Sequence, residues 1–414
     1  GSLVYEGAGQ KKAAVSDLTY PVAGALGLDP LRAAGDYQTR GTTHELRLVS
    51  PDGGDWSWIG GVFLLDYSAD ASAELYVNAP VASSLLILNQ LLPFDVLTGK
   101  GISAGKTITS PIAKETSLYG EVARKFAQDW ELTLGLRYYR TSIEGERKQS
   151  GAAFGQGNTV QIDQADKGFS LRIALTWQPA PGIMLYGATA RGFQFGGINI
   201  VAVAQLPVNN PVTGTPVPPE YGSSSLWSKE LGIRTEWLGR TLRADLTVFD
   251  LDWTDAQIPQ STGGVYISQY YDNVGKVRSR GLESTVSWLT PIPGVALNLS
   301  AAYTRAVTAE DYVDGGGKTV PAGAVMPATP RLQTASTLSY NTGIGAFLTS
   351  ASLTHTYAGP AYSKIENDTQ IYDYQQLNLN LSVNRPDWSG RPTFDLGISN
   401  LLNEAGLLDR GGEP

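Results

Sequence analysis

Cysteine is absent from the 414-residue chain, and histidine and methionine occur only twice each. The protein therefore forms no disulfide and no thiolate metal site, and two distant histidines, His44 and His355, do not indicate a histidine metal centre. No apolar run reaches about 18 residues, which excludes a membrane-spanning helix. The net charge is −8, and no dense basic patch indicates binding of nucleic acid. We expect no cofactor, no metal and no nucleic-acid partner.

The most informative positive feature is an alternation of apolar and polar residues with a period of two. Residues 130, 132, 134, 136 and 138 are Trp, Leu, Leu, Leu and Tyr, whereas the intervening positions are Glu, Thr, Gly and Arg. The same alternation recurs at residues 171–178, 242–248, 295–304 and 376–383. Successive side chains of a strand point to opposite faces, so each segment predicts a strand with one apolar and one polar face.

Three further features separate a membrane barrel from a soluble β-sandwich. The predicted strands are about 9 to 14 residues long, as a membrane-spanning strand requires, and aromatic residues gather near their ends. Short connections alternate with long ones, as periplasmic turns alternate with extracellular loops. The long ones fall near residues 68–114, 141–168, 194–226, 254–275, 305–328 and 358–373.

We therefore predict an all-β protein, a transmembrane antiparallel β-barrel with at least 14 visible strands. Residues 1–41 are ambiguous between loop and strand, residues 42–404 form the barrel, and residues 405–414 form a turn or tail before a missing last strand. The strands are expected near residues 42–50, 56–67, 115–126, 130–140, 169–178, 183–193, 227–237, 241–253, 276–289, 295–304, 329–340, 346–357, 373–384 and 392–400.

Several short stretches, in this order, resemble the barrel of the TonB-dependent receptor family. They are HELRL at residues 44–48, WIGGVF at 58–63, ETSLYGE at 115–121, LTLGLRY at 132–138, LYGATARGF at 185–193, KELGI at 229–233, NVGKVRSRGLE at 273–283, Pro330-Arg331, and LGISNLLN at 396–403. The likeness extends from about residue 42 to 404, and it is the shared order of these fragments that makes it specific.

The resemblance implies substrate-specific uptake across the outer membrane of a Gram-negative bacterium. Its partners would be outer-membrane lipid, a small-molecule or saccharide ligand (a siderophore, cobalamin, haem or a sugar), and TonB with its inner-membrane energising complex. Members of the family carry an N-terminal plug and a 22-stranded barrel, and nothing before residue 42 resembles a plug. We expect the chain to be part of a larger receptor; a plugless relative is the alternative.

Candidate ligand contacts come from two groups of residues. Aromatic side chains near the long connections suit sugars and planar ligands, and charged residues on the polar strand faces would line the lumen. Those that we select are Phe193, Phe195, Trp253, Tyr266 and Tyr270 from the first group and Arg137 and Arg234 from the second. Anchoring in the membrane interface and pairing of charges within the barrel wall explain the same residues without a ligand.

Other readings of the sequence stay open at this point. The acidic residues Asp250, Asp252 and Asp255 are of the type that binds Ca²⁺, but a solvated loop rim also explains them. No sequence motif indicates catalysis, so we predict that the protein is not an enzyme. A passive porin or a plugless structural barrel is the main alternative to an active receptor, and a soluble all-β binding protein is the third.

Overall fold

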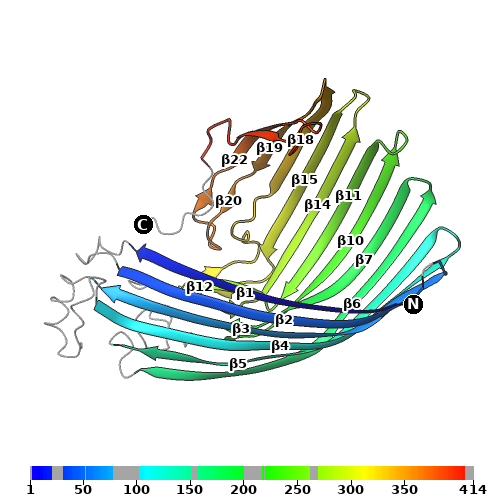
Figure 1. Ribbon diagram of the computed structural model, residues 1–414. Coiled ribbons are helices and arrows are strands. Elements are labelled where there is room, and N and C mark those ends of the chain that lie inside the picture. Colours follow the sequence, from blue (N-terminus) through cyan, green and yellow to red (C-terminus); the bar gives the residue numbers. More distant parts are fainter. Residues whose placement is uncertain are drawn as a thin grey trace.

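The computed structural model describes residues 2–20, 31–51, 53–77, 102–151, 157–199, 217–218, 220–261 and 269–405. All of its regular elements are β-strands (Figure 1). Within these ranges no helix has the length and apolarity needed to cross a membrane. The strands of the main sheet are β1 (Ser2–Tyr20), β2 (Leu31–Val49), β3 (Trp56–Val77), β4 (Ile102–Phe126), β5 (Trp130–Ser150), β6 (Asn158–Ala180), β7 (Ile183–Gln194), β10 (Ser224–Trp237), β11 (Leu242–Thr254), β14 (Lys276–Leu289), β15 (Val295–Thr308), β18 (Leu332–Ile344), β19 (Phe347–Ala358), β22 (Tyr374–Asn384) and β23 (Thr393–Ile398).

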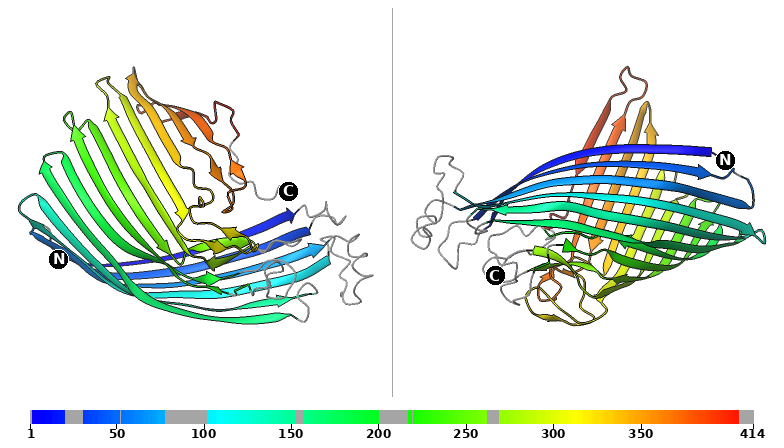
Figure 2. Two further views of the ribbon diagram at one scale, coloured as in Figure 1. Left: turned by 180° about the vertical axis from the view of Figure 1, so that it is seen from behind. Right: turned by 90° about the horizontal axis from the view of Figure 1, so that it is seen from below.

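These 15 strands form one continuous antiparallel meander, in which each strand pairs with its neighbours along the main sheet. Figure 2 shows that the sheet curves strongly, so that it has a concave and a convex side. Strands β1 and β23 lie at the two ends of the described sheet and are not paired with each other. The prediction of an all-β antiparallel barrel wall is confirmed, with the wall open between these two strands.

The two faces of the sheet differ as the alternation predicted, and β5 shows this most clearly. Its odd-numbered residues Thr133, Tyr139 and Thr141 are 9% exposed or less, whereas Leu134 and Leu136 are 43% and 52% exposed. Side chains crowd together on the concave side of a curved sheet and spread apart on its convex side. The apolar stripe therefore covers the convex side, where a bilayer would contact it.

A pair of aromatic residues marks each end of this apolar stripe. Near the turns, the rings of Trp130 and Trp177 stack with their centroids 5.2 Å apart. Eight residues further along β5, Tyr138 contacts Phe169 at 5.1 Å. At about 3.4 Å per residue the two pairs are about 27 Å apart along the strand, comparable to the apolar band of an outer-membrane barrel, about 25 Å.

Strands β3 to β6 continue well past the predicted ends of their membrane segments. The sequence predicted long loops over residues 68–114 and 141–168, but β3 and β5 extend into these ranges as far as Val77 and Ser150, and β4 and β6 begin within them. The reason is visible on β5. Beyond Tyr138 the residues on its convex face are no longer apolar and include Arg140, Glu144 and Lys148. On β5 the convex face is therefore polar beyond the apolar band, so this part of the strand loses the alternation by which strands were predicted.

The remaining long connections carry short hairpins of their own. These are β8 (Gly197–Ile198) with β9 (Glu220–Tyr221), β12 (Gln257–Ser261) with β13 (Gln269–Asn273), β16 (Tyr312–Val313) with β17 (Thr319–Val320), and β20 (Ala361–Tyr362) with β21 (Gln370–Ile371). These hairpins lie within every second connection of the meander, and because neighbouring strands are antiparallel, these connections are all at the same end of the wall. The predicted alternation of short turns and long loops is confirmed here.

The assignment of the two faces can be tested with neighbouring residues of β15. Leu299 is exposed on the convex side, and Asn298 is exposed on the concave side. We expect Leu299→Arg to destabilise the protein in a bilayer by about 2–4 kcal/mol and Asn298→Arg by less than about 1 kcal/mol, because only Leu299 faces lipid. Urea titration in lipid vesicles measures both values, and equal costs would show that the faces are assigned wrongly.

Candidate functional site in the lumen and its loops

Arg137, one of the predicted lumen residues, lies in an ion pair on the concave side of the wall. Its guanidinium donates to the carboxylate of Glu115, which is only 5% exposed and also accepts a hydrogen bond from Ser117. The same guanidinium lies over the ring of Phe63, 5.2 Å from its centroid. Arg137 therefore joins β3, β4 and β5, and part of its donor capacity is already used within the wall.

Similar polar contacts connect the concave faces of β1 to β6. Arg47 donates to Glu6 at 2.8 Å and contacts Glu45 at 3.4 Å, and the hydroxyl of Tyr119 donates to Glu45. Two strands further on, Arg172 donates to Glu121 at 2.9 Å. These cross-strand pairs hold neighbouring strands in register and give this part of the lumen a polar, largely compensated surface.

Arg234 lies apart from the other predicted site residues. It is three residues from the turn end of β10, and its guanidinium is 5.2 Å from the ring centroid of Tyr186. Tyr186 in turn shares a hydrogen bond of 2.9 Å with Thr247, and its ring lies directly over Gly232, which has no side chain to obstruct it. The structure therefore places Arg234 at the turn end of the wall, away from the loop aromatics.

The loop aromatics do gather at the opposite end. The ring of Phe193 stacks on that of Tyr139 with centroids 3.5 Å apart, and Phe195 meets Phe193 edge-on at 5.6 Å. The backbone carbonyl of Phe195 accepts a hydrogen bond of 2.6 Å from Gln257 in β12. The cluster thus connects β5, the end of β7 and the β12–β13 hairpin.

Trp253, near the end of β11, lies at the base of that same hairpin, whereas Tyr270 lies in β13 opposite Gln260. The indole N–H of Trp253 donates to Ser224 at 2.9 Å, and its ring packs against the buried residues Ala256 and Ile258. Tyr270 is only 7% exposed. Tyr266 lies outside the described residues. In this arrangement Trp253 and Tyr270 help to fold the loop that a ligand would meet.

The hairpins above the wall have small apolar cores of their own. Ile258 belongs to one core, and Val320, 1% exposed, belongs to a second with Ala324 and Ile365. Met326 packs against both cores. A hydrogen bond of 2.9 Å from the Gly315 amide to Gln260 crosses between the β12–β13 and β16–β17 connections. Three long connections therefore form one packed layer over the lumen.

A cavity of about 570 Å³ lies between this layer and the concave face of β14, β15, β18, β19 and β22. One row of neighbouring residues on these five strands lies along its floor: Glu283, Ala302, Gln333, Ala358 and Tyr374. The second row, parallel to the first, is made of Thr285, Ser300, Ala335 and Thr356. Loop residues, among them Pro330, Gly359, Ile371 and Tyr372, also line the cavity.

Of these cavity residues the sequence indicated only Glu283, as one of the charged residues on the lumen face, and none of the seven selected ligand contacts lines the cavity. The signal present in the sequence was weak: the polar faces of these strands carry small residues such as Ala302, Ala335 and Ala358, which leave room above the sheet. A run of small residues predicts a cavity only when the partner that covers it is known. That partner is the loop layer, whose position follows from tertiary packing.

The acidic residues considered for Ca²⁺ are engaged by basic side chains. Asp250 accepts from Arg278 through both carboxylate oxygens, at 2.9 and 2.5 Å, and Asp252 accepts from Lys229 at 3.2 Å. Asp255 is exposed at the end of β11. Within the described ranges no group of three His, Cys, Asp or Glu residues is arranged to hold a metal ion.

Two carboxylates in the loop layer make its packing dependent on pH. Burial raises the pKa of Glu366 above its ordinary value of 4.5, and the nearby carboxyl of Asp314 raises it further. Asp368 adds to this effect, although Lys318 lies 3.8 Å from Asp368. Because the protonated form of Glu366 is the one that fits the folded loops, its contribution is complete below pH 4.5 and is lost as pH rises through the folded pKa.

We therefore expect the β16–β17 and β20–β21 hairpins to be better protected at pH 4.5 than at pH 8. Hydrogen exchange of residues 312–326 and 361–371, corrected for the intrinsic pH dependence of exchange, measures this protection. Glu366→Gln, which is neutral at both values, should abolish the difference. Protection that increases with pH in the parent protein would contradict the assignment.

Comparisons with known proteins agree with this architecture. The profile of the family described as "TonB dependent receptor-like, beta-barrel" matches residues 8–401. No curated protein matches the sequence. Among solved structures, the ferric yersiniabactin uptake receptor FyuA from Yersinia pestis superposes with a TM-score of 0.73 at 15% identity, over 98% of this chain and 55% of the receptor.

Two further solved structures show the same fold. The copper transporter OprC gives a TM-score of 0.69 at 15% identity, over 99% of this chain and 58% of OprC. BauA, the ferric preacinetobactin receptor from Acinetobacter baumannii, gives 0.65 at 16% identity, over 98% and 57%. The chain thus spans a little over half the length of these solved proteins. Because the match to the family's β-barrel covers nearly the whole chain, the protein belongs to the TonB-dependent receptor family.

Proposed function

We propose that the protein is an outer-membrane receptor of a Gram-negative bacterium that takes up a scarce ligand in a TonB-dependent manner. The observation that carries the proposal is the roofed cavity on the lumen side of a wall that belongs to this family. A ligand bound there would lie between the extracellular loops and the lumen, on the path of uptake. The bilayer would contact the apolar convex face.

The chemistry of the cavity favours a neutral to weakly charged organic ligand of moderate size. Its volume, about 570 Å³, falls within the range of small-molecule sites, about 300–1,000 Å³. Hydroxyl and amide groups on the floor supply donors and acceptors, and Tyr372 and Tyr374 supply ring faces. Glu283 is its single charged lining residue among those described.

The ligand class follows from the family and from the cavity together. Siderophores, cobalamin, haem and saccharides are the candidates, and the similar solved structures are receptors for ferric yersiniabactin and ferric preacinetobactin and a copper transporter. A metal chelate wrapped in an organic ligand presents hydroxyl and amide groups to the outside, which the floor of the cavity can pair with. We therefore rank an organic metal chelate first and a saccharide second.

The chain spans a little over half the length of the solved receptors. Coupling to TonB is therefore proposed for the complete receptor and not for these 414 residues alone. In this family a plug inside the barrel transmits the pull of TonB. The polar concave face of β1 to β6, with its ion pairs near Glu45, Glu115 and Glu121, has the chemistry of a wall that contacts such a domain.

Dependence on TonB distinguishes active uptake from passive diffusion. We expect cells that carry the complete receptor to accumulate a radiolabelled ferric siderophore from nanomolar solution only when TonB is present. Ferric siderophores of several classes, cyanocobalamin and haem are tested in parallel. Uptake that is equal in cells with and without TonB would support the passive porin instead.

The cavity is tested by shortening two of its floor residues. We expect Gln333→Ala and Tyr374→Ala each to weaken binding of the transported ligand by about tenfold, because each removes a directed contact. Tyr340→Ala is the matched control, since Tyr340 lies near the turn end of β18 and does not line the cavity. Affinities measured by calorimetry on detergent-purified receptor that are unchanged in all three variants would place the ligand elsewhere.

A further inference from the structure

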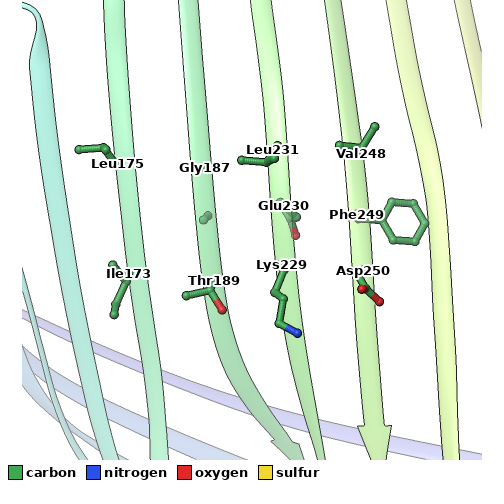
Figure 3. Close-up of a pocket in the computed structure, with 11 residues that line it drawn as sticks. Ile173, Leu175, Gly187, Thr189, Lys229, Glu230, Leu231, Val248, Phe249 and Asp250 are labelled. Carbon is green, nitrogen blue, oxygen red and sulfur yellow. The ribbon is translucent and has the colours of Figure 1, made fainter.

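A second cavity lies on the convex side of the wall, over β6, β7, β10 and β11 (Figure 3). Its volume is about 440 Å³. Leu175, Gly187, Leu231 and Val248 are direct neighbours in the sheet and form one row across it. Because Gly187 has no side chain, the row is interrupted there and a shallow groove runs along β7 between its neighbours. We call this feature the convex groove.

The convex groove lies within the apolar band of the wall. Leu231 is 65% exposed and Val248 is 44% exposed, and both are on the same face of the sheet as Leu134. A Cβ atom added at Gly187 would lie 3.0 Å from a terminal carbon of Leu231, so even alanine would begin to fill the groove. Its lining is aliphatic, which suits a hydrocarbon chain.

Charged residues begin at the loop end of the same groove. The next convex row after Leu231 and Val248 contains Lys229 and Asp250, followed in the neighbouring strands by Arg280 and Arg305. Figure 3 shows Lys229 and Asp250 beside the aliphatic residues. The apolar band therefore gives way to charge within two residues along each strand, at the level where lipid headgroups would lie.

The charged cluster has an excess of positive charge. Lys229, Arg278, Arg280 and Arg305 stand against two carboxylates, those of Asp250 and Asp252, which leaves a net charge of about +2 when each side chain carries one unit. The carboxylates are shared among Lys229, Arg278 and Arg280.

Arg280 and Arg305 provide the strongest indication of a missing anion. They are direct cross-strand neighbours in β14 and β15, and like charges placed opposite each other destabilise a sheet. Among the residues that the structure describes, Arg280 has one ion pair, a long one of 3.4 Å to Asp250, and its side chain is 59% exposed. Arg305 is exposed and has no ion pair within the described part of the chain. An anion between the two guanidiniums would remove the repulsion.

We propose that the convex groove binds one phosphate-bearing lipid, with a hydrocarbon chain over Gly187 and a phosphate between Arg280 and Arg305. The inference rests on the proposed location in the outer membrane. Guanidinium groups bind phosphate through paired hydrogen bonds, and the aliphatic row lies on the membrane side of them. A free phosphate would satisfy the arginines alone and leave the groove unfilled. A lipid satisfies both.

The test uses the complete receptor, extracted from membranes in dodecyl maltoside and titrated with diphosphoryl lipid A. Native mass spectrometry counts bound lipid, with inorganic phosphate and a neutral diacylglycerol as comparison ligands. One variant removes both opposed charges, Arg280→Gln with Arg305→Gln. A second, Gly187→Leu, fills the groove. The matched control, Arg172→Gln with Arg243→Gln, removes two arginines of the concave face, each of which is paired with a glutamate.

We expect one tightly bound lipid A in the parent and in the control. The double variant at Arg280 and Arg305 should bind it at least about tenfold more weakly, and Gly187→Leu should weaken it as well. Equal affinity in all proteins, or inorganic phosphate binding as tightly as lipid A, would overturn the proposal. Heat-modified migration in gels checks that each variant is folded.

The same experiment separates failure of this inference from failure of the proposed function. Recovery of the parent protein in the soluble fraction of cells would overturn the outer-membrane location and the lipid site together. A protein that is recovered in the membrane but retains no lipid A overturns the lipid site alone and leaves transport untouched.

Discussion

The backbone hydrogen bonds between neighbouring strands are the constraint on which the rest of this structure depends. Inside a bilayer no water is available to unpaired N–H and C=O groups, so every strand must pair with another along its membrane segment. In the meander from β1 to β23 each inner strand meets this requirement by pairing on both sides, and only the outer edges of β1 and β23 have no partner within the described sheet. Once this ladder exists, side chains alternate between lipid and lumen, and each face can be specialised separately.

The concave and convex faces have accordingly different chemistry on the same strands. On the concave side, ion pairs such as Arg137 with Glu115 hold strands in register and line a polar lumen. On the convex side, leucines and aromatic rings form a band that ends in the basic cluster around Arg280. The cavity under the loop layer and the convex groove are therefore built from opposite faces of a single wall.

The long connections cover part of the concave face of the wall and so enclose a cavity. Their hairpins share apolar cores through Met326 and lie over small residues on the strands beneath. The carboxyl pair of Glu366 and Asp314 lies within this layer, where burial raises the pKa of Glu366.

The sequence by itself determined the fold class, the two faces of each strand and the alternation of turns and loops, because each depends on local periodicity. The order of its barrel fragments also identified the family. It did not determine the ends of β3 to β6, where Arg140 and Lys148 remove the apolar alternation. Nor did it locate the cavity: Phe193 and Trp253 reach the loop layer, Arg137 and Arg234 do not, and Gln333 and Tyr374 went unnoticed. Only the tertiary structure decided which residues meet, because the cavity forms where two connections, β15–β18 and β19–β22, pack over five strands.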